Sequence, residues 1–179
     1  MGYLKRKADE FLCRWKDQED RLPLIIQGAR QIGKTETIRK FAAEHYDHVV
    51  EINFVTDPKY KSIIDNGFAA DAIIKSISLV DPGKEMAPGN TLIFFDEIQA
   101  FPEIATSLKF FKEDGQYDVV CSGSLLGIQY QHIASISVGY KEDYRMYSMD
   151  FEEFLWAKGY REEQMDSILA HMLSGEPFS

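Results

Sequence analysis

Short apolar runs alternate along the chain with stretches in which apolar residues recur every three or four positions. The apolar runs predict β-strands at residues 22–27, 48–54, 91–95, 118–121 and 144–149. The helical spacing predicts helices at residues 3–18, 35–46, 57–66, 68–80, 104–115, 151–158 and 161–173. Because strands and helices alternate, we expect an α/β fold of three layers, with helices on both faces of a central parallel sheet.

Residues 28–35 complete the spacing G-x-x-x-x-G-K-[ST] between the first predicted strand and the helix after it. Glycine lets the backbone turn tightly and approach a phosphate, and the successive N–H groups form a nest of donors. Lys34 is expected to reach the β- and γ-phosphates, and the Thr35 hydroxyl to ligate Mg²⁺. The predicted phosphate-binding residues are Gly28, Ala29, Arg30, Gln31, Ile32, Gly33, Lys34, Thr35 and Glu36. The side chains of Arg30 and Gln31 are expected to point outward.

A second acidic motif follows the strand predicted at residues 91–95, which ends in Asp96 and Glu97. In a phosphate-loop protein, a strand that ends beside the loop presents an aspartate toward Mg²⁺. We therefore assign Asp96, with Thr35, to the metal, and Glu97 to polarising a water in line with the γ-phosphate. The Asn-Lys-x-Asp motif that reads guanine is absent from the sequence, which argues against GTP.

The sequence Cys121-Ser122-Gly123-Ser124 follows the fourth predicted strand. Its hydroxyls would lie beside the γ-phosphate or the attacking water, as a polar sensor. A simple Ser-Gly turn is the alternative, and the pattern does not distinguish Ser122 from Ser124. Weaker candidates have ordinary structural interpretations: a solvated turn for His45 and His48, a core position for Cys121, and surface pairing for Arg145, which is also a candidate for stabilising a transition-state charge.

Composition fits a soluble globular domain with a sizeable core. The 179 residues are 45% hydrophobic and 27% charged, and 20 Lys and Arg against 29 Asp and Glu give a net charge of −9. This balance disfavours broad, non-specific binding of nucleic acid. Cys13 and Cys121 have no metal or redox spacing, which predicts reduced thiols in the cytoplasm. No stretch approaches the roughly 18 apolar residues of a membrane span.

Taken together, the motifs resemble those of the AAA-type (AAA-like) ATPases of bacteria and archaea that usually carry a C-terminal domain of unknown function. The segments that carry the resemblance, from about residue 3 to residue 160, are residues 28–35, 51–54, 95–99, 122–127 and 149–155. The strand between the loop and Asp96 is similar to that of the additional-strand, catalytic-glutamate branch of these ATPases. The resemblance implies a sheet with strand order 5-1-4-3-2, and the roles given above for Lys34, Thr35, Asp96 and Glu97.

The resemblance also implies a division of the chain. We expect an N-terminal amphipathic helix packed on the core within residues 1–20, a P-loop ATPase domain at 21–160, and the start of a truncated C-terminal helical region at 161–179. Members of the family normally continue further, so the chain is expected to be a fragment or a short relative. Apolar side chains on its C-terminal side are then candidates for binding a protein partner or a second copy, among them Leu169, Met172 and Leu173.

Two functions remain open from the sequence. One is an ATP-hydrolysing, Mg²⁺-dependent switch or motor module that moves an attached domain or partner. The other is a nucleotide-binding interaction module with negligible turnover. A phosphotransferase is less favoured, because Glu97 suits activation of water better than transfer to an acceptor.

Overall fold

The computed structural model describes residues 3–124 and 137–174. Within these residues one parallel sheet contains β1 (Leu24–Gln27), β2 (His48–Asn53), β3 (Thr91–Asp96), β4 (Asp118–Gly123) and β5 (Glu142–Arg145). The order across the sheet is β2-β3-β4-β1-β5, and every neighbouring pair is parallel. Counted from the other edge, this is the 5-1-4-3-2 order implied by the family resemblance. β1 therefore lies inside the sheet, between β4 and β5.

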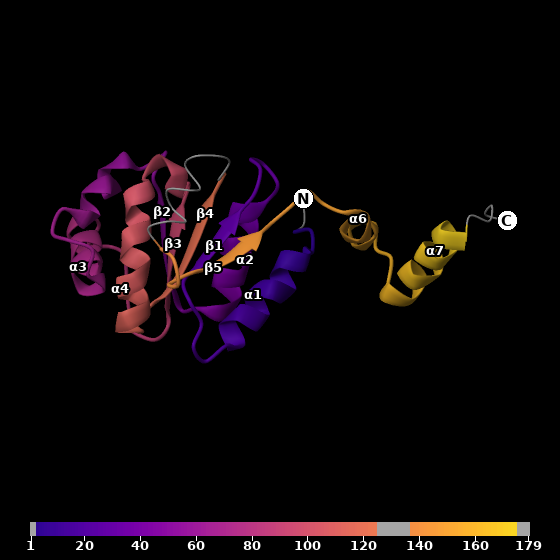
Figure 1. Ribbon diagram of the computed structural model, residues 1–179, viewed down its shortest axis with the longest axis horizontal. Coiled ribbons are helices and arrows are strands. Elements are labelled where there is room, and N and C mark those ends of the chain that lie inside the picture. Colours follow the sequence, from indigo (N-terminus) through magenta and orange to yellow (C-terminus); the bar gives the residue numbers. More distant parts are fainter. Residues whose placement is uncertain (1–2, 125–136, 175–179) are drawn as a thin grey trace.

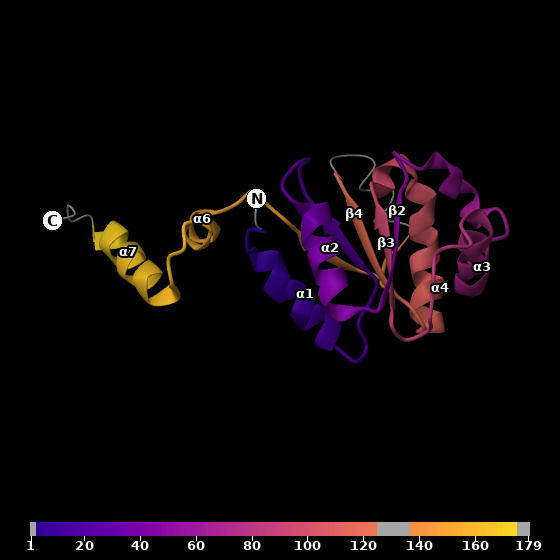
Figure 2. The same cartoon turned by 180° about the vertical axis from the view of Figure 1, so that it is seen from behind.

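Helices cover both faces of the sheet (Figure 1, Figure 2). One face is covered by α1 (Lys7–Asp17) and α2 (Lys34–His45), and the other by α3 (Ala70–Val80) and α4 (Ser107–Asp114). Short 3₁₀ helices lie at Pro58–Ile64, Ile98–Ala100 and Pro102–Thr106. The result is the three-layer α/β fold that the alternation of strands and helices predicts.

The core has two parts because neighbouring residues of a strand point to opposite faces of the sheet. In β3, Phe95 packs toward α3 and α4 and has ring contacts with Phe54 and Phe111, whereas Phe94 packs toward α1 and α2. All six residues of β3 are buried. This explains why β3 reads as an unbroken apolar run, as strands covered on both faces do. The fixed strand then holds Asp96 at its carboxyl end.

The prediction of the fifth strand was wrong in position. The apolar pattern placed it at residues 144–149, but β5 is Glu142–Arg145. β5 is an edge strand, and its sequence Glu-Asp-Tyr-Arg is largely charged, as edge strands that avoid aggregation often are. The chain leaves the sheet directly after Met146, whose N–H still donates to Gln27 O at 2.8 Å. The apolar residues at 144–149 therefore lie mostly in the segment that follows the strand, not in the strand itself.

Two helix predictions also need refinement. The helix predicted at 57–66 is the 3₁₀ helix Pro58–Ile64, and the one predicted at 104–115 begins as a 3₁₀ helix before α4. Proline at the first turn of both 3₁₀ helices sets φ and removes an N–H donor, which suits a short helical start. Residues 1–2, 125–127 and 175–179, which belong to predicted segments, lie outside the described residues.

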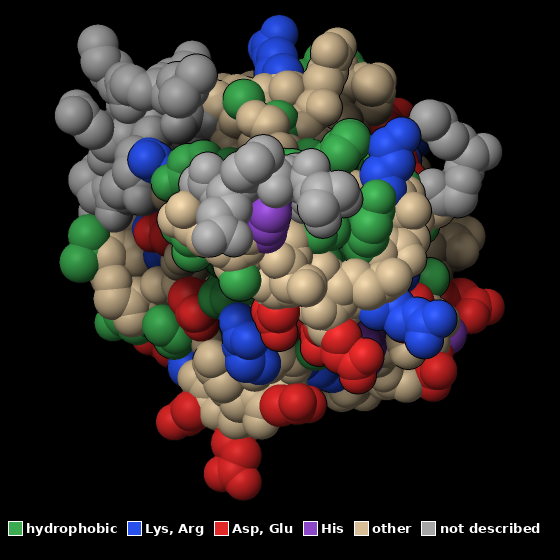
Figure 3. All heavy atoms as spheres, turned by 90° about the vertical axis from the view of Figure 1, so that its right-hand side faces the viewer, with side chains coloured by type: hydrophobic (Ala, Val, Ile, Leu, Met, Phe, Trp, Pro, Cys, Tyr) green, Lys and Arg blue, Asp and Glu red, His purple; other side chains and the backbone are tan. Residues whose placement is uncertain are grey.

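The C-terminal helices α6 (Phe151–Ala157) and α7 (Glu162–Ser174) extend away from the sheet (Figure 1). Met165 of α7 is buried, but Met172 and Leu173 are 55% and 89% exposed. Figure 3 faces this end, where apolar and acidic side chains both reach the surface. Among the described residues, every helix is too short or too polar to span a lipid bilayer.

Candidate functional site

The loop at residues 28–33 joins the central strand β1 to the first turn of α2. Gly33 has φ +94° and Gln31 has φ +62°, so the backbone turns through the left-handed region twice. At Gly28 the constraint is different, because a Cβ there would lie 2.3 Å from the backbone oxygen of Met146. The sequence analysis assigned this glycine to phosphate approach, whereas the structure requires it for contact with the segment after β5. The loop therefore has the tight backbone turn before the α2 N-terminus that the predicted anion-binding nest requires.

Lys34 is buried and folds back over this loop. Its Nζ donates to the backbone oxygens of Gly28 at 3.0 Å and Ala29 at 2.5 Å. Burial lowers the pKa of Lys34, an effect that the nearby Glu97 and Asp96 carboxylates oppose. Within the described residues, no carboxylate forms an ion pair with Lys34. The hydrogen bonds of Lys34 are thus to backbone carbonyls, while the Glu97 and Asp96 carboxylates act on it only at longer range.

Asp96 lies at the carboxyl end of β3, and its two oxygens collect polar groups from several elements. Oδ2 accepts from Thr35 Oγ1 at 3.2 Å and from Asn53 Nδ2 at 3.0 Å. Oδ1 accepts from the Glu97 N–H at 3.0 Å and from the Ser122 hydroxyl. The hydroxyl of Thr35 and the carboxylate of Asp96 are the hard oxygen donors that Mg²⁺ prefers, so the residues present fit this ion.

Glu97 follows with an uncommon backbone, φ +57° and ψ +44°, in the left-handed region. Its carboxylate lines a cavity of about 600 Å³ together with Lys34, Thr35 and Asn53. Glu97 Oε2 accepts a hydrogen bond from Gln99 Nε2. A non-glycine residue held in this region is a local strain of the kind that active sites often contain.

The two serines at the end of β4, Ser122 within the strand and Ser124 directly after it, have different surroundings. Ser122 is fully buried, and its hydroxyl donates to Asp96. Ser124 instead donates its backbone N–H to Gln99 Oε1 at 3.2 Å. The Ser124 hydroxyl is buried and finds no hydrogen-bond partner within the described residues. Ser122 therefore contacts the Asp96 carboxylate through its hydroxyl, whereas Ser124 contacts the Gln99 side chain through its backbone.

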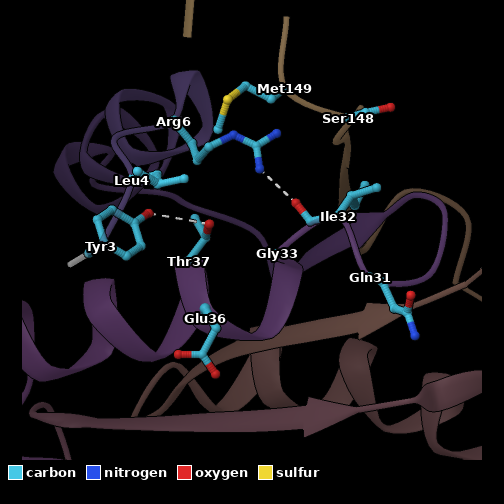
Figure 4. A pocket seen from close by; sticks show the side chains of 10 residues that line it. All are labelled: Tyr3, Leu4, Arg6, Gln31, Ile32, Gly33, Glu36, Thr37, Ser148 and Met149. Carbon is cyan, nitrogen blue, oxygen red and sulfur yellow. Dashed lines mark hydrogen bonds between the residues drawn. The ribbon is translucent and has the colours of Figure 1, made fainter. Parts of the chain in front are cut away.

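The remaining residues of the predicted loop set lie around the nest. Ala29, Arg30, Gln31 and Glu36 are exposed, and Ile32 is half-buried. In Figure 4 the Gln31 side chain points away from Arg6 and Met149. Glu36 pairs with Arg39 across one helical turn at 2.8 Å. Arg30, Gln31 and Glu36 all line the 600 Å³ cavity. Their exposed side chains therefore lie at the border of this cavity.

A second cavity of about 540 Å³ lies on the other side of the loop (Figure 4). Its walls include Tyr3 and Leu4 from the N-terminal segment, Gly33 and Thr37 from the start of α2, and Met149 from the segment before α6. The Tyr3 hydroxyl and Thr37 Oγ1 are hydrogen-bonded at 3.3 Å. The cavity is therefore bounded by segments far apart in the sequence.

Arg6, which the sequence analysis did not identify, joins these segments. Its Nη1 donates to Ile32 O of the loop at 2.6 Å, and its Nη2 to Tyr147 O at 2.7 Å. Its Nε lies 3.2 Å from Glu153 Oε1 of α6. Both charged side chains are buried, and removing them from water costs free energy. Their ion pair and hydrogen bonds must offset that cost. A charged residue just before an amphipathic helix was the only sequence signal available.

Asn53 and Gln99 were also missed as site residues. Asn53 ends β2, the neighbour of β3, and polar side chains at the carboxyl ends of adjacent parallel strands meet at one edge of the sheet. That rule could have identified it. Of the weaker candidates, Cys121 is buried in the core as expected, and burial raises the pKa of its thiol. His48 is the half-buried first residue of β2 and faces Glu85 at 3.5 Å, rather than lying in a solvated turn. Arg145 is exposed. The described residues contain no cluster of three metal-binding His, Cys, Asp or Glu side chains.

Comparison with solved structures supports the fold. Drosophila ORC bound to DNA matches with a TM-score of 0.55 and 13% identity, over 90% of this chain and 47% of that chain. DnaA from Aquifex aeolicus bound to AMPPCP matches with a TM-score of 0.50 and 14% identity, over 94% and 57%. PCH-2 from C. elegans matches with a TM-score of 0.48 and 12% identity, over 97% and 48%, a score too low to add support for the fold. The chain spans about half the length of these structures.

Comparison at the level of sequence identifies the family. A search of curated proteins finds no match, but a family model does match. This model, described as an AAA domain, matches residues 20–155, which include the phosphate loop, Asp96, Glu97 and the end of β4. Fold and family together make the chain a P-loop NTPase module that binds nucleotide. It therefore belongs to the AAA domain family.

Proposed function

We propose that the chain binds ATP with Mg²⁺ and hydrolyses it, and that this cycle switches or moves an attached domain or partner. One observation supports this above all others: Lys34, Thr35 and Glu97 line one cavity, and Asp96 is hydrogen-bonded to Thr35 at its edge. A phosphate-binding cation, a metal-binding pair and a base are thus in one place. Hydrolysis needs these groups together.

In this proposal the phosphates lie on the loop at residues 28–33, and the base and ribose extend toward the 540 Å³ cavity. Tyr3, Leu4 and Met149 give that cavity apolar walls, which suit the flat face of a purine. Gly33 lines both cavities. One nucleotide could therefore occupy the two cavities continuously.

Each residue then has one task. Lys34 would leave the carbonyls of Gly28 and Ala29 to contact the β- and γ-phosphates, and Thr35 and Asp96 would hold Mg²⁺. The ion supplies positive charge beside the phosphate oxygens. Glu97 accepts a proton as the water oxygen bonds to the γ-phosphorus and the bond from that phosphorus to the ADP oxygen breaks. Ser122 keeps Asp96 oriented, and Ser124 is placed to sense the γ-phosphate.

We place the moving part on the C-terminal side. The N-terminal helix within residues 1–20 and the domain at 21–160 form the nucleotide unit, and 161–179 begins the helical region that follows. Phe151 and Phe154 of α6 are 44% and 45% exposed and stack at 6.5 Å between ring centroids. Such a face suits a protein partner or a second copy. The net charge of −9 favours these over a nucleic acid.

The compartment we propose is the cytoplasm. Cys13 is exposed and Cys121 is buried, and both are free thiols. An unpaired exposed thiol suits a reducing environment.

A nucleotide-binding interaction module with negligible turnover is the second candidate. The observation that favours it is the hydrogen bond from Gln99 to Glu97, which engages one oxygen of the proposed base. In that case ATP would stabilise an assembly surface without being consumed.

Phosphate release without an added acceptor distinguishes the two candidates. Glu97→Gln should keep nucleotide affinity, because the amide preserves shape, and lower turnover by about 10² to 10⁴, as expected for loss of a positioned base. Asp96→Asn should lose Mg²⁺-dependent affinity as well. Glu44→Gln, at the far end of α2, is the matched control and should match the parent. Parental turnover in Glu97→Gln would reject Glu97 as the base. Absence of turnover in the parent as well as in every variant would favour the interaction module.

A further inference from the structure

Gln99 lies between Glu97 and the end of β4 and contacts both. Its Nε2 donates to Glu97 Oε2, and its Oε1 accepts the Ser124 N–H at 3.2 Å. Reversing the amide would set its oxygen against a carboxylate and its NH₂ against an N–H donor. Both contacts therefore specify one orientation of the amide. Gln99 is a two-ended bridge whose polarity matches each end.

Glu97 depends on such support. Its left-handed backbone is strained for a residue with a Cβ, and it persists only where surrounding contacts hold it. Its N–H donates to Asp96 Oδ1 at 3.0 Å, and its carbonyl accepts from Ala100 N at 2.9 Å. Within the described residues, Gln99 is the one hydrogen-bond donor to the Glu97 carboxylate. These hydrogen bonds thus hold the backbone of Glu97 in place, and the hydrogen bond from Gln99 holds its carboxylate.

The end of β4 is tied to the end of β3 at two points. Ser122 contacts Asp96 directly, through its hydroxyl. Ser124 contacts Glu97 indirectly, through Gln99. Asp96 is therefore linked to Ser122, and Glu97 is linked through Gln99 to Ser124. These two serines lie two residues apart at the end of β4. A shift of this strand end would move both partners together.

We propose that Gln99 is a positioning residue that ties the Glu97 carboxylate to the end of β4 at Ser124. The inference rests on the proposed role of Glu97 in hydrolysis. Gln99 does not line the cavity that contains Lys34 and Thr35, so loss of the bridge leaves nucleotide binding intact. Turnover falls because the base is no longer held in line with the phosphate.

Gln99→Met tests this, since methionine has a similar length and neither donor nor acceptor for the bridge. Turnover should fall about tenfold to a hundredfold, the effect of a misplaced catalytic group, while ATP affinity by calorimetry stays within about twofold of the parent. The matched control is Gln116→Met. Gln116 Nε2 also donates to a carboxylate two residues earlier, Asp114 Oδ1 at 2.8 Å, but on the α4–β4 connection. It should change neither quantity.

A second measurement does not need turnover. Amide hydrogen exchange at Ser124, followed by NMR, should accelerate about tenfold in Gln99→Met because the N–H loses its acceptor. It should be unchanged in Gln116→Met. Unchanged exchange at Ser124 overturns the bridge, whatever the activity.

The two proposals fail in different ways. If Glu97→Gln lowers turnover and Gln99→Met does not, Glu97 is the base and Gln99 does not position it. If Glu97→Gln leaves turnover at the parental rate, the hydrolytic role of Glu97 fails first and the positioning role fails with it. Loss of ATP affinity in Gln99→Met would also overturn the inference, because it would give Gln99 a general structural role.

Discussion

Replacing Arg6 by methionine tests whether one buried cation holds the N-terminal segment, the phosphate loop and α6 together. The guanidinium donates to Ile32 O at 2.6 Å and Tyr147 O at 2.7 Å and pairs with Glu153 at 3.2 Å. The Arg6 and Glu153 side chains are only 9% and 6% exposed, so water solvates neither charge well. Methionine keeps much of the aliphatic length and removes the charge with its donors.

The magnitude follows from these contacts. Removing one member of a buried ion pair costs about 3 to 5 kcal/mol, because the other charge stays buried alone. Glu153 keeps two backbone donors, from Lys7 at 2.8 Å and Asp150 at 3.0 Å, which sets its share near the lower value. Two carbonyls that lose a donor add about 1 kcal/mol each. The expected loss of about 5 kcal/mol corresponds to a fall in Tm of roughly 10 to 20 °C.

Guanidinium unfolding followed by tryptophan fluorescence measures this loss, because Trp15 on α1 is buried. Arg14→Met, an exposed arginine on the same helix, is the matched control and should stay within about 0.5 kcal/mol of the parent. If Arg6→Met does not fold, the double variant with Glu153→Met should, since it removes both buried charges. A loss below about 1 kcal/mol in Arg6→Met would refute the reasoning.

Three further predictions concern the loop and the far end of the sheet. Lys34→Met should weaken ATP binding in calorimetry, because it removes the cation proposed to contact the β- and γ-phosphates; equal affinity would reject the loop's proposed role. Gly28→Ala should displace the loop from the Met146 carbonyl and lower Tm, whereas an unchanged Tm would show that the contact is easily relieved. Burial alone would raise the pKa of Asp118, but hydrogen bonds led by that from Arg21 lower it below its ordinary value. Its stabilisation is therefore present above an unfolded pKa of about 3.9 and is lost as pH falls through the lower folded pKa. The difference in free energy of unfolding between parent and Asp118→Asn should shrink between pH 5 and pH 2, and a constant difference would contradict this.

The sequence predicted the fold and the candidate site best where the residues that determine a feature are close together in the chain. The loop at 28–35, β3 and its acidic end could be recognised because their spacing and apolar runs are continuous in the chain. β5 was misplaced because an edge strand needs no apolar run. Its position is set by pairing with β1, more than a hundred residues earlier, which periodicity does not report.

The missed site residues have distant or unremarkable signals. The partners of Arg6 lie 26 and 141 positions away, so only the folded chain brings them together. Gln99 is close to Glu97 in sequence, but its role depends on Ser124 and on the left-handed backbone at Glu97. The difference between Ser122 and Ser124 likewise depends on which way each side chain points from the end of β4.

The strand order has a consequence for synthesis of the protein. β1 is made first, but both of its neighbours, β4 and β5, are made last. At about 5 to 20 residues per second, the roughly ninety residues between β1 and β4 take on the order of 5 to 18 seconds to emerge. During that time β2 and β3 can pair with each other, while the apolar β1 has no place in a sheet. The sheet that holds the phosphate loop is therefore incomplete until β4 arrives, and the nascent chain exposes an unpaired apolar strand to chaperones throughout that interval.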